Sequence, residues 1–326
     1  MMASNGIIAF YEKFFGSRKL YGTKEDTQTF IDYAMRCDID AFDKSVVDKY
    51  YDSPYFIEYR ILKYVLNAYK IPDGISYGSA YSKEMNATSS KYQGTSSILV
   101  DELLLFTIQS FIYTIFSLIN DRSDENCERC IKNCVVFLDL QGLRKTIGVH
   151  DYQDVQRTLM LPTNLMHMAS DAYWMVWTFI AGHELYHLQN NQSSLTYQDE
   201  ISADTFGYSL LMKMIEDQKR GSLPPNINAF PEYLYLAPIM LFEYFNFLDF
   251  YRKLCGQEVC YQNHPSPTDR QDNIFSLYDC VPDSFNTETG NSILNSFLDA
   301  VDYLKEQIQL KKIRGKLEIG EIELTT

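Results

Sequence analysis

The sequence has no long run of basic residues, and its overall charge is strongly acidic. Its 43 Asp and Glu residues outnumber its 29 Lys and Arg residues, which gives a formal net charge of −14. Such a surface repels phosphate groups, so nucleic acid is not expected as a partner. The densest basic cluster, at residues 311–316, is interpreted as a solvated helix end.

An even set of closely spaced cysteines, typical of small disulfide-bonded domains, is also missing. The chain has 7 Cys in 326 residues, and a chain of this length can form its own hydrophobic core. These features favour a reducing compartment and free thiols. The apolar patch at residues 7–11 is followed at once by Glu12 and Lys13, so it is too short for a secretory signal. A cytoplasmic location is therefore predicted.

The apolar run at residues 103–119 (LLLFTIQSFIYTIFSLI) falls short of the about 20 residues that a membrane-spanning helix needs. Gln109, Ser110 and Ser117 interrupt it further. A buried core helix is the favoured interpretation, and a membrane helix is the alternative. A membrane partner is therefore not expected.

The remaining patterns predict a helix-rich α+β protein. Apolar residues recur at helical spacing, and helices are expected at residues 27–35, 54–69, 171–189, 198–219, 234–254 and 293–311. Two strands are expected, at Ser96–Val100 and Cys134–Leu140. Residues 74–94 are interpreted as a long loop or short irregular strands.

The segment Ile180–Gln189 (IAGHELYHLQ) gives the strongest indication of function. Residues four apart lie on one face of a helix, so His183 and His187 can bind a single tetrahedral Zn²⁺ ion. Glu184 can act as general base on a zinc-bound water and then pass the proton to a leaving amine. No charged residue falls between Asp171 and His183, as expected of a helix buried beneath a metal site. The alternative is a pair of core histidines beside a solvated glutamate.

A catalytic zinc ion needs a third protein ligand and an open fourth position. Glu200 follows His187 by thirteen residues and can complete a His₂Glu site. Asp204 shares a helix face with Glu200 and can accept the second ring N–H of a zinc-bound histidine, which fixes the tautomer of that histidine. The small residues Ala203 and Gly207 would let this helix approach the histidine helix closely. The alternative is an exposed acidic first turn, which the helix dipole favours.

The order of these residues resembles that of the gluzincin metallopeptidases, H-E-x-x-H followed by E-x-x-x-D. His264–Arg270 (HPSPTDR) is similar to the H-P-x-x-x-x-R segment that follows the ligands in HtpX-like peptidases and some soluble relatives. The resemblance implies that His264 lies near the transition-state oxyanion and that Arg270 pairs with an acid of the site. In length and layout the chain is more similar to the Lit-type phage-exclusion peptidases. The alternative for this segment is a proline-rich loop with Thr268 as a helix N-cap.

A second cluster, Cys127, Cys130 and Cys134, has a spacing that binds zinc or an iron–sulfur cluster when further ligands join. No second pair with ligand spacing follows, since four residues separate Cys255 from Cys260. The first three cysteines also fit one helix face, so buried thiols are favoured.

The sequence therefore predicts an intracellular zinc-dependent endopeptidase whose partner is a protein or peptide substrate and whose cofactor is Zn²⁺. The resemblance implies a zincin-like metallopeptidase domain with a small sheet at residues 96–326. A mixed, mostly helical region at residues 1–95 precedes it. The main alternative is a regulatory or interaction protein stabilised by a non-catalytic zinc ion, and a membrane peptidase with a span at residues 103–119 is the third.

Overall fold

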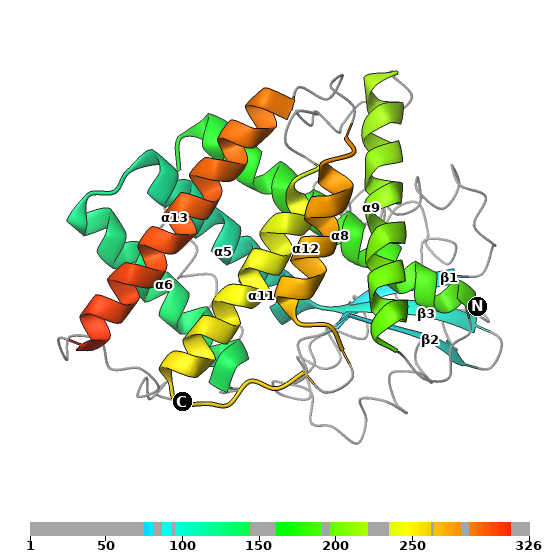
Figure 1. The fold of residues 1–326 in the computed structure, drawn as a ribbon, viewed down its shortest axis with the longest axis horizontal. Helices are drawn as coiled ribbons and strands as arrows, with labels where there is room; N and C mark the ends of the chain where they lie inside the picture. The colour runs from blue at the N-terminus through cyan, green and yellow to red at the C-terminus, as the bar shows by residue number, and fades with distance from the viewer. Residues whose placement is uncertain are drawn as a thin grey trace, which may run out of the picture.

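The computed structural model describes residues 75–80, 87–92, 95–143, 161–190, 196–220, 235–261, 264–281 and 287–313. The helices expected at residues 27–35 and 54–69 lie outside these described residues. Three strands come first, and Figure 1 labels them β1 (Ile75–Ala80), β2 (Ala87–Tyr92) and β3 (Thr95–Asp101). The helices that follow are α5 (Glu102–Asn120), α6 (Asp124–Leu143), α8 (Thr163–Asn190), α9 (Tyr197–Lys219), α11 (Ala237–Leu254), α12 (Pro267–Tyr278) and α13 (Thr287–Ile313).

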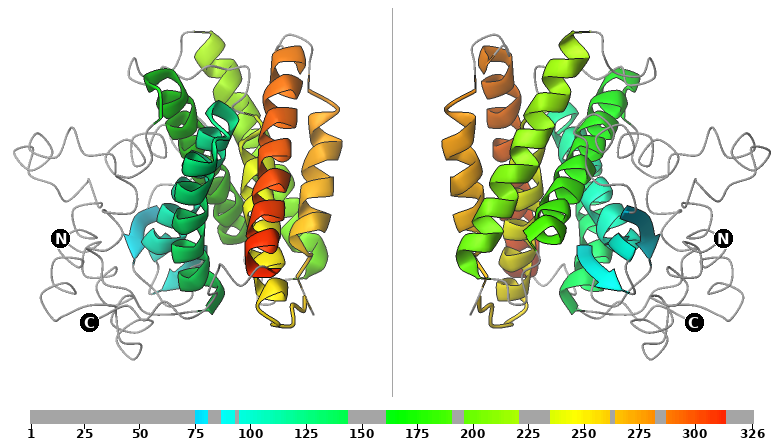
Figure 2. Two further views of the ribbon diagram at one scale, coloured as in Figure 1. Left: turned by 90° about the vertical axis from the view of Figure 1, so that its left-hand side faces the viewer. Right: turned by 90° about the vertical axis from the view of Figure 1, so that its right-hand side faces the viewer.

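The helices pack side by side into one body, with the strands along its side (Figure 2). α8 contacts α5, α9 and α11, and α11 in turn contacts α12 and α13. An aromatic cluster fills the space between these helices, because the ring of Phe111 on α5 lies within about 6 Å of the rings of Tyr244, Phe247 and Phe297. The four long helices expected from residue 171 onward are confirmed, although α8 begins earlier, at Thr163.

The apolar run at residues 103–119 lies within α5, and its interpretation as a core helix is confirmed. Thr107 and Thr114 on α5 are fully buried, and each hydroxyl donates to a backbone carbonyl one turn earlier, at 3.0 and 2.7 Å. These bonds satisfy the polar groups inside an apolar environment. No helix in the described ranges combines the length and the hydropathy required to cross a bilayer.

The fold class differs from the one that the sequence predicts. The helix-rich character is as expected, but the predicted α+β, zincin-like domain, with a small sheet inside residues 96–326 built from Ser96–Val100 and Cys134–Leu140, is wrong. From α5 to α13 the described residues form helices and no strand, and Cys134–Leu140 lies inside α6. The physical reason is tertiary packing, which outweighs a local β preference. α6 packs against α5, and Cys127, Cys130 and Cys134 are buried on one face of α6.

The three strands before the helical body pair in the order β1-β3-β2, with β1 parallel and β2 antiparallel to β3. β3 contains Ser96–Val100, so that strand is confirmed, but its partners are the two strands within residues 74–94. β2 and β3 contact α8, and Ile98 and Val100 are buried there. The strands therefore lie against the helix that carries the two histidines.

α8 and α9 approach each other at a contact between two glycines. A methyl group on Gly182 would lie 3.0 Å from the Cα of Gly207, and one on Gly207 would lie 2.9 Å from the carbonyl oxygen of Phe179. Real side chains need more room than this, so both glycines are required for the observed spacing. The close approach expected of Gly207 is confirmed, and its partner on α8 is Gly182.

Candidate metal centre

The two histidines lie on one face of α8. His183 and His187 have their Nε2 atoms 3.0 Å apart, and their side chains are 9% and 8% exposed. The i, i+4 spacing aims both rings at the same point. Ile180 and Leu188 on the surrounding face of α8 are apolar and buried in the core. The two imidazoles therefore lie at the edge of a helix face that is otherwise apolar and shielded from water.

Glu200 reaches the same point from the first turn of α9. Its carboxylate oxygens lie 3.4 Å from His183 Nε2 and 3.6 Å from His187 Nε2, and the residue is 5% exposed. Thr196 and Asp199 cap the helix reciprocally, since the backbone N–H of each donates to the side chain of the other. The cap fixes where α9 begins and so places Glu200 one turn inside. The exposed acidic turn is therefore not what the structure contains at Glu200.

The spacing of these three ligand atoms fits a zinc ion. Tetrahedral zinc bonds of about 2.0–2.1 Å place neighbouring ligand atoms about 3.3 Å apart. The observed separations of 3.0, 3.4 and 3.6 Å surround this value. Among the described residues, His183, His187 and Glu200 are the one group whose His, Cys, Asp or Glu atoms are arranged to hold a metal. The residues present therefore fit the ion that the sequence suggests.

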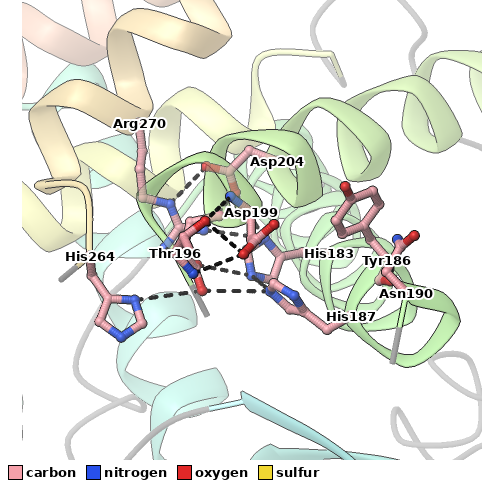
Figure 3. Close-up of polar contacts among 10 residues, drawn as sticks. His183, Tyr186, His187, Asn190, Thr196, Asp199, Asp204, His264 and Arg270 are labelled. Atoms are coloured by element: carbon pink, nitrogen blue, oxygen red, sulfur yellow. Dashed lines mark hydrogen bonds and ion pairs between the residues drawn. The ribbon is translucent and has the colours of Figure 1, made fainter. Parts of the chain in front are cut away.

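Asp204 and Arg270 hold His183 from the other side (Figure 3). The Asp204 carboxylate is fully buried, and one of its oxygens lies 2.9 Å from His183 Nδ1. Arg270, on α12, donates from Nε at 2.8 Å and from Nη2 at 2.6 Å to the two oxygens of Asp204. This two-pronged pairing is the strongest form of Arg–carboxylate contact. A carboxylate that accepts the Nδ1–H leaves the Nε2 lone pair of His183 free for a metal.

The charges of the cluster shift the ionisation of its members in opposite directions. Burial lowers the pKa of His183, but hydrogen bonds to Asp204 and Glu200 outweigh it and raise the pKa to about 9. Burial and the charge of His183 lower the pKa of His187. Burial raises the pKa of Glu200, but contacts with His183 and the charges around it bring that pKa down to about 2. Without metal, the cluster therefore carries one proton on His183 beside an ionised Glu200.

Glu184 lies next to His183 and is 7% exposed. Its burial raises the pKa of the carboxyl group, and the charge of His183 and a hydrogen bond from Ser89 on β2 oppose that shift. A carboxylate with a raised pKa is a better proton acceptor, as a general base requires. Glu184 is not one of the three grouped ligand residues, so it remains available for such a role.

His264 lies at the edge of the cluster, with Nδ1 3.5 Å from Glu200 Oε1 and a side chain that is 57% exposed. It precedes α12, whose N-cap is Ser266 rather than Thr268. A capping box with Asp269 forms this cap. The segment His264–Arg270 thus places its histidine beside Glu200 and its arginine against Asp204.

Three residues that contribute to the site have no signal in the sequence. Gly182 sets the spacing of α8 and α9. Ser89 bonds Glu184 from a strand about a hundred residues earlier. Phe242 on α11 lies under the guanidinium of Arg270, with the ring centroid 4.7 Å from Cζ. Each acts through a tertiary contact between segments that are distant in the sequence.

The cysteines of α6 take no part in this centre. Cys127, Cys130 and Cys134 are buried free thiols, as the helical spacing predicts, and within the described residues they join no group with metal-binding geometry. Burial raises the pKa of Cys130 to about 11. A thiol with so high a pKa is a poor metal ligand and a poor nucleophile at neutral pH.

No protein-family model, no curated protein and no solved structure matches this chain. The gluzincin resemblance therefore stays a prediction.

Proposed function

We propose that the protein is a cytoplasmic zinc-dependent endopeptidase that hydrolyses peptide bonds of a protein substrate. The observation that carries the proposal is the buried His183, His187 and Glu200 group with Glu184 beside it. Three protein ligands leave one of the four positions of a tetrahedral zinc ion open. A structural site would use four protein ligands, and the described residues supply no fourth to this group.

In this proposal Glu184 carries out the proton transfers of hydrolysis beside the metal. When bound, zinc lowers the pKa of a water molecule towards 7 and polarises the substrate carbonyl. Glu184 takes a proton from the attacking water while the oxygen bonds to the carbonyl carbon. The peptide C–N bond then breaks, and Glu184 delivers that proton to the departing amine nitrogen. One water is consumed, and a new carboxyl group and a new amine are formed.

The remaining polar residues orient this reaction. Asp204 holds His183 by Nδ1, and Arg270 holds Asp204, so the ligand set is rigid before substrate arrives. His264 is exposed beside Glu200, and we propose that it donates to the carbonyl oxygen as negative charge develops there. The acidic surface, with its net charge of −14, favours a basic segment of the substrate.

Removal of the metal is expected to abolish hydrolysis, and addition of zinc to restore it. The measurement is cleavage of unfolded casein by the purified protein after treatment with a chelator, and again after zinc is supplied. Zinc bound at about one ion per chain without any cleavage, across a wider panel of proteins, would favour the regulatory or interaction protein instead. Cleavage that persists in the metal-free protein would contradict the proposal.

Metal binding is expected to release one proton at neutral pH. The metal-free protein keeps His183 protonated up to about pH 9, and a metal needs the neutral imidazole. Below pH 9 the metal competes with protons for His183, and the proton concentration falls tenfold per pH unit, so the apparent affinity increases by about tenfold per pH unit and levels off above the pKa. Titration calorimetry in buffers of different ionisation enthalpy counts the protons released. Binding without proton release at pH 7 would mean that His183 is neutral beforehand.

A further inference from the structure

A line of polar side chains joins α12 to α11 and α13. Gln271 on α12 donates through Nε2 to Glu243 Oε2 at 3.1 Å and accepts at Oε1 from Asn246 Nδ2 at 2.9 Å. Lys305 on α13 donates to Glu243 Oε1 at 2.6 Å. Thr268 on α12 donates to Asn246 Oδ1 at 3.1 Å. We call these five residues the α12 network.

The α12 network is not explained by stability alone. Glu243 and Gln271 are only 7% and 8% exposed, and a buried ion pair often stabilises a fold no better than apolar residues of the same size. Hydrogen bonds, unlike apolar contacts, depend on direction. Three of the four bonds end on α12, at Gln271 and Thr268, and because they depend on direction they restrict how α12 is rotated about its own axis.

That rotation decides where Arg270 points. Arg270 lies immediately before Gln271, and its guanidinium crosses the ring of Phe242, the neighbour of Glu243, to reach Asp204. One residue of a helix corresponds to about 100° of rotation. The side chains of Arg270 and Gln271 therefore point about 100° apart, and a rotation of α12 that separates Gln271 from Glu243 also turns Arg270 away from the buried Asp204 carboxylate that holds His183.

We propose that Glu243, Gln271 and Asn246 are positioning residues of the metal centre. They set the angle of α12, which aims Arg270 at Asp204 and thereby fixes the orientation of His183. The part of this inference that concerns metal binding rests on the proposed function. Its effect on Arg270 can be measured without any metal.

The test replaces Gln271 by Met, a residue of similar length that forms helices well and makes neither hydrogen bond. Glu243 keeps Lys305 in Gln271→Met, so no buried charge is left alone. The matched control is Tyr244→Phe, on the same helix, which removes a buried hydroxyl that donates at 2.7 Å to Thr107 on α5. Three quantities are compared with wild type: the thermal midpoint, the affinity for Co²⁺, and hydrogen exchange of the Arg270 Nε–H in metal-free protein by NMR.

We expect Gln271→Met to weaken Co²⁺ binding about tenfold, as loss of outer partners does at metal sites. We also expect it to speed exchange at Arg270 Nε about tenfold. Tyr244→Phe should lower the thermal midpoint and leave both other quantities unchanged. The inference is overturned if Gln271→Met behaves like Tyr244→Phe, with a changed midpoint alone.

Two further outcomes are also decisive. If wild type binds no Co²⁺, the proposed function fails, while Arg270 exchange still decides whether the α12 network positions this arginine. If Gln271→Met does not fold, Asn246→Ala is measured in its place, because it removes the bonds to Gln271 and Thr268 at a half-buried position. Unchanged exchange at Arg270 in Asn246→Ala would overturn the inference.

Discussion

Replacing Glu184 by Gln is expected to abolish peptide hydrolysis while leaving the metal bound. The amide has nearly the shape of the carboxylate but accepts no proton at neutral pH, so the attacking water loses its general base. We expect kcat to fall by about 10²–10⁴-fold. The zinc content should be unchanged, because Glu184 lies outside the group formed by His183, His187 and Glu200. Turnover of a fluorogenic peptide and zinc per chain are the two measurements.

Glu184→Asp is the matched control, because it keeps a carboxylate and shortens it by one methylene group. Partial activity in Glu184→Asp, with none in Glu184→Gln, would show that proton transfer rather than the packing of the side chain is lost. Full turnover in Glu184→Gln would place the general base elsewhere. Loss of zinc from Glu184→Gln would instead make Glu184 a ligand.

Several helices could be predicted from the sequence because their apolar period runs without interruption. α9 begins within one residue of its expected start, and α5 coincides with the apolar run at residues 103–119. Cys134–Leu140 shows the limit of this approach. A run of seven residues with two valines, two leucines and a phenylalanine fits a strand or a buried helix segment equally well. Contacts with α5 decide between the two, such as the contact of Cys130 Sγ with the carbonyl oxygen of Thr114. The local sequence pattern contains no information on these contacts.

The place of the sheet could not be predicted for a related reason: a small sheet is expected within residues 96–326, but β1 and β2 lie before that range. β1 and β2 consist largely of serine, glycine, tyrosine and alanine, residues that are also typical of loops. They become strands because β3 lies between them and pairs with both. Pairing is a property of the three segments together, so no single segment carries its signal.

The residues of the metal centre also differ in how far local spacing predicts them. His183 and His187 could be predicted because one helix turn determines their separation. Glu200 and Asp204 follow from their own i, i+4 spacing once α8 and α9 are antiparallel neighbours. The acid that Arg270 meets could not be derived from spacing, because 66 residues separate it from Asp204. Packing of α12 on α11 and α9 brings the two together.

Replacing Glu200 by Ala is expected to empty the metal centre. The change removes one of three ligands, and it also removes the anion that faces His183, His187 and Arg270. Loss of an outer partner already costs about 10–100-fold in metal affinity, so loss of a direct ligand should cost more than about 100-fold. Zinc per chain, by elemental analysis after dialysis, should fall from about one to near zero.

Asp199→Ala is the control, since it removes the preceding carboxylate of the same helix turn. Asp199 caps α9 together with Thr196, so its loss should cost about 1 kcal/mol of stability and leave the zinc content unchanged. If both variants lose zinc, the start of α9 rather than the Glu200 carboxylate is what binding requires. If Glu200→Ala keeps zinc at wild-type affinity, the third ligand must come from elsewhere. His264 is the residue to test next, because its Nδ1 lies 3.5 Å from the Glu200 carboxylate and could move into the place that Glu200 leaves.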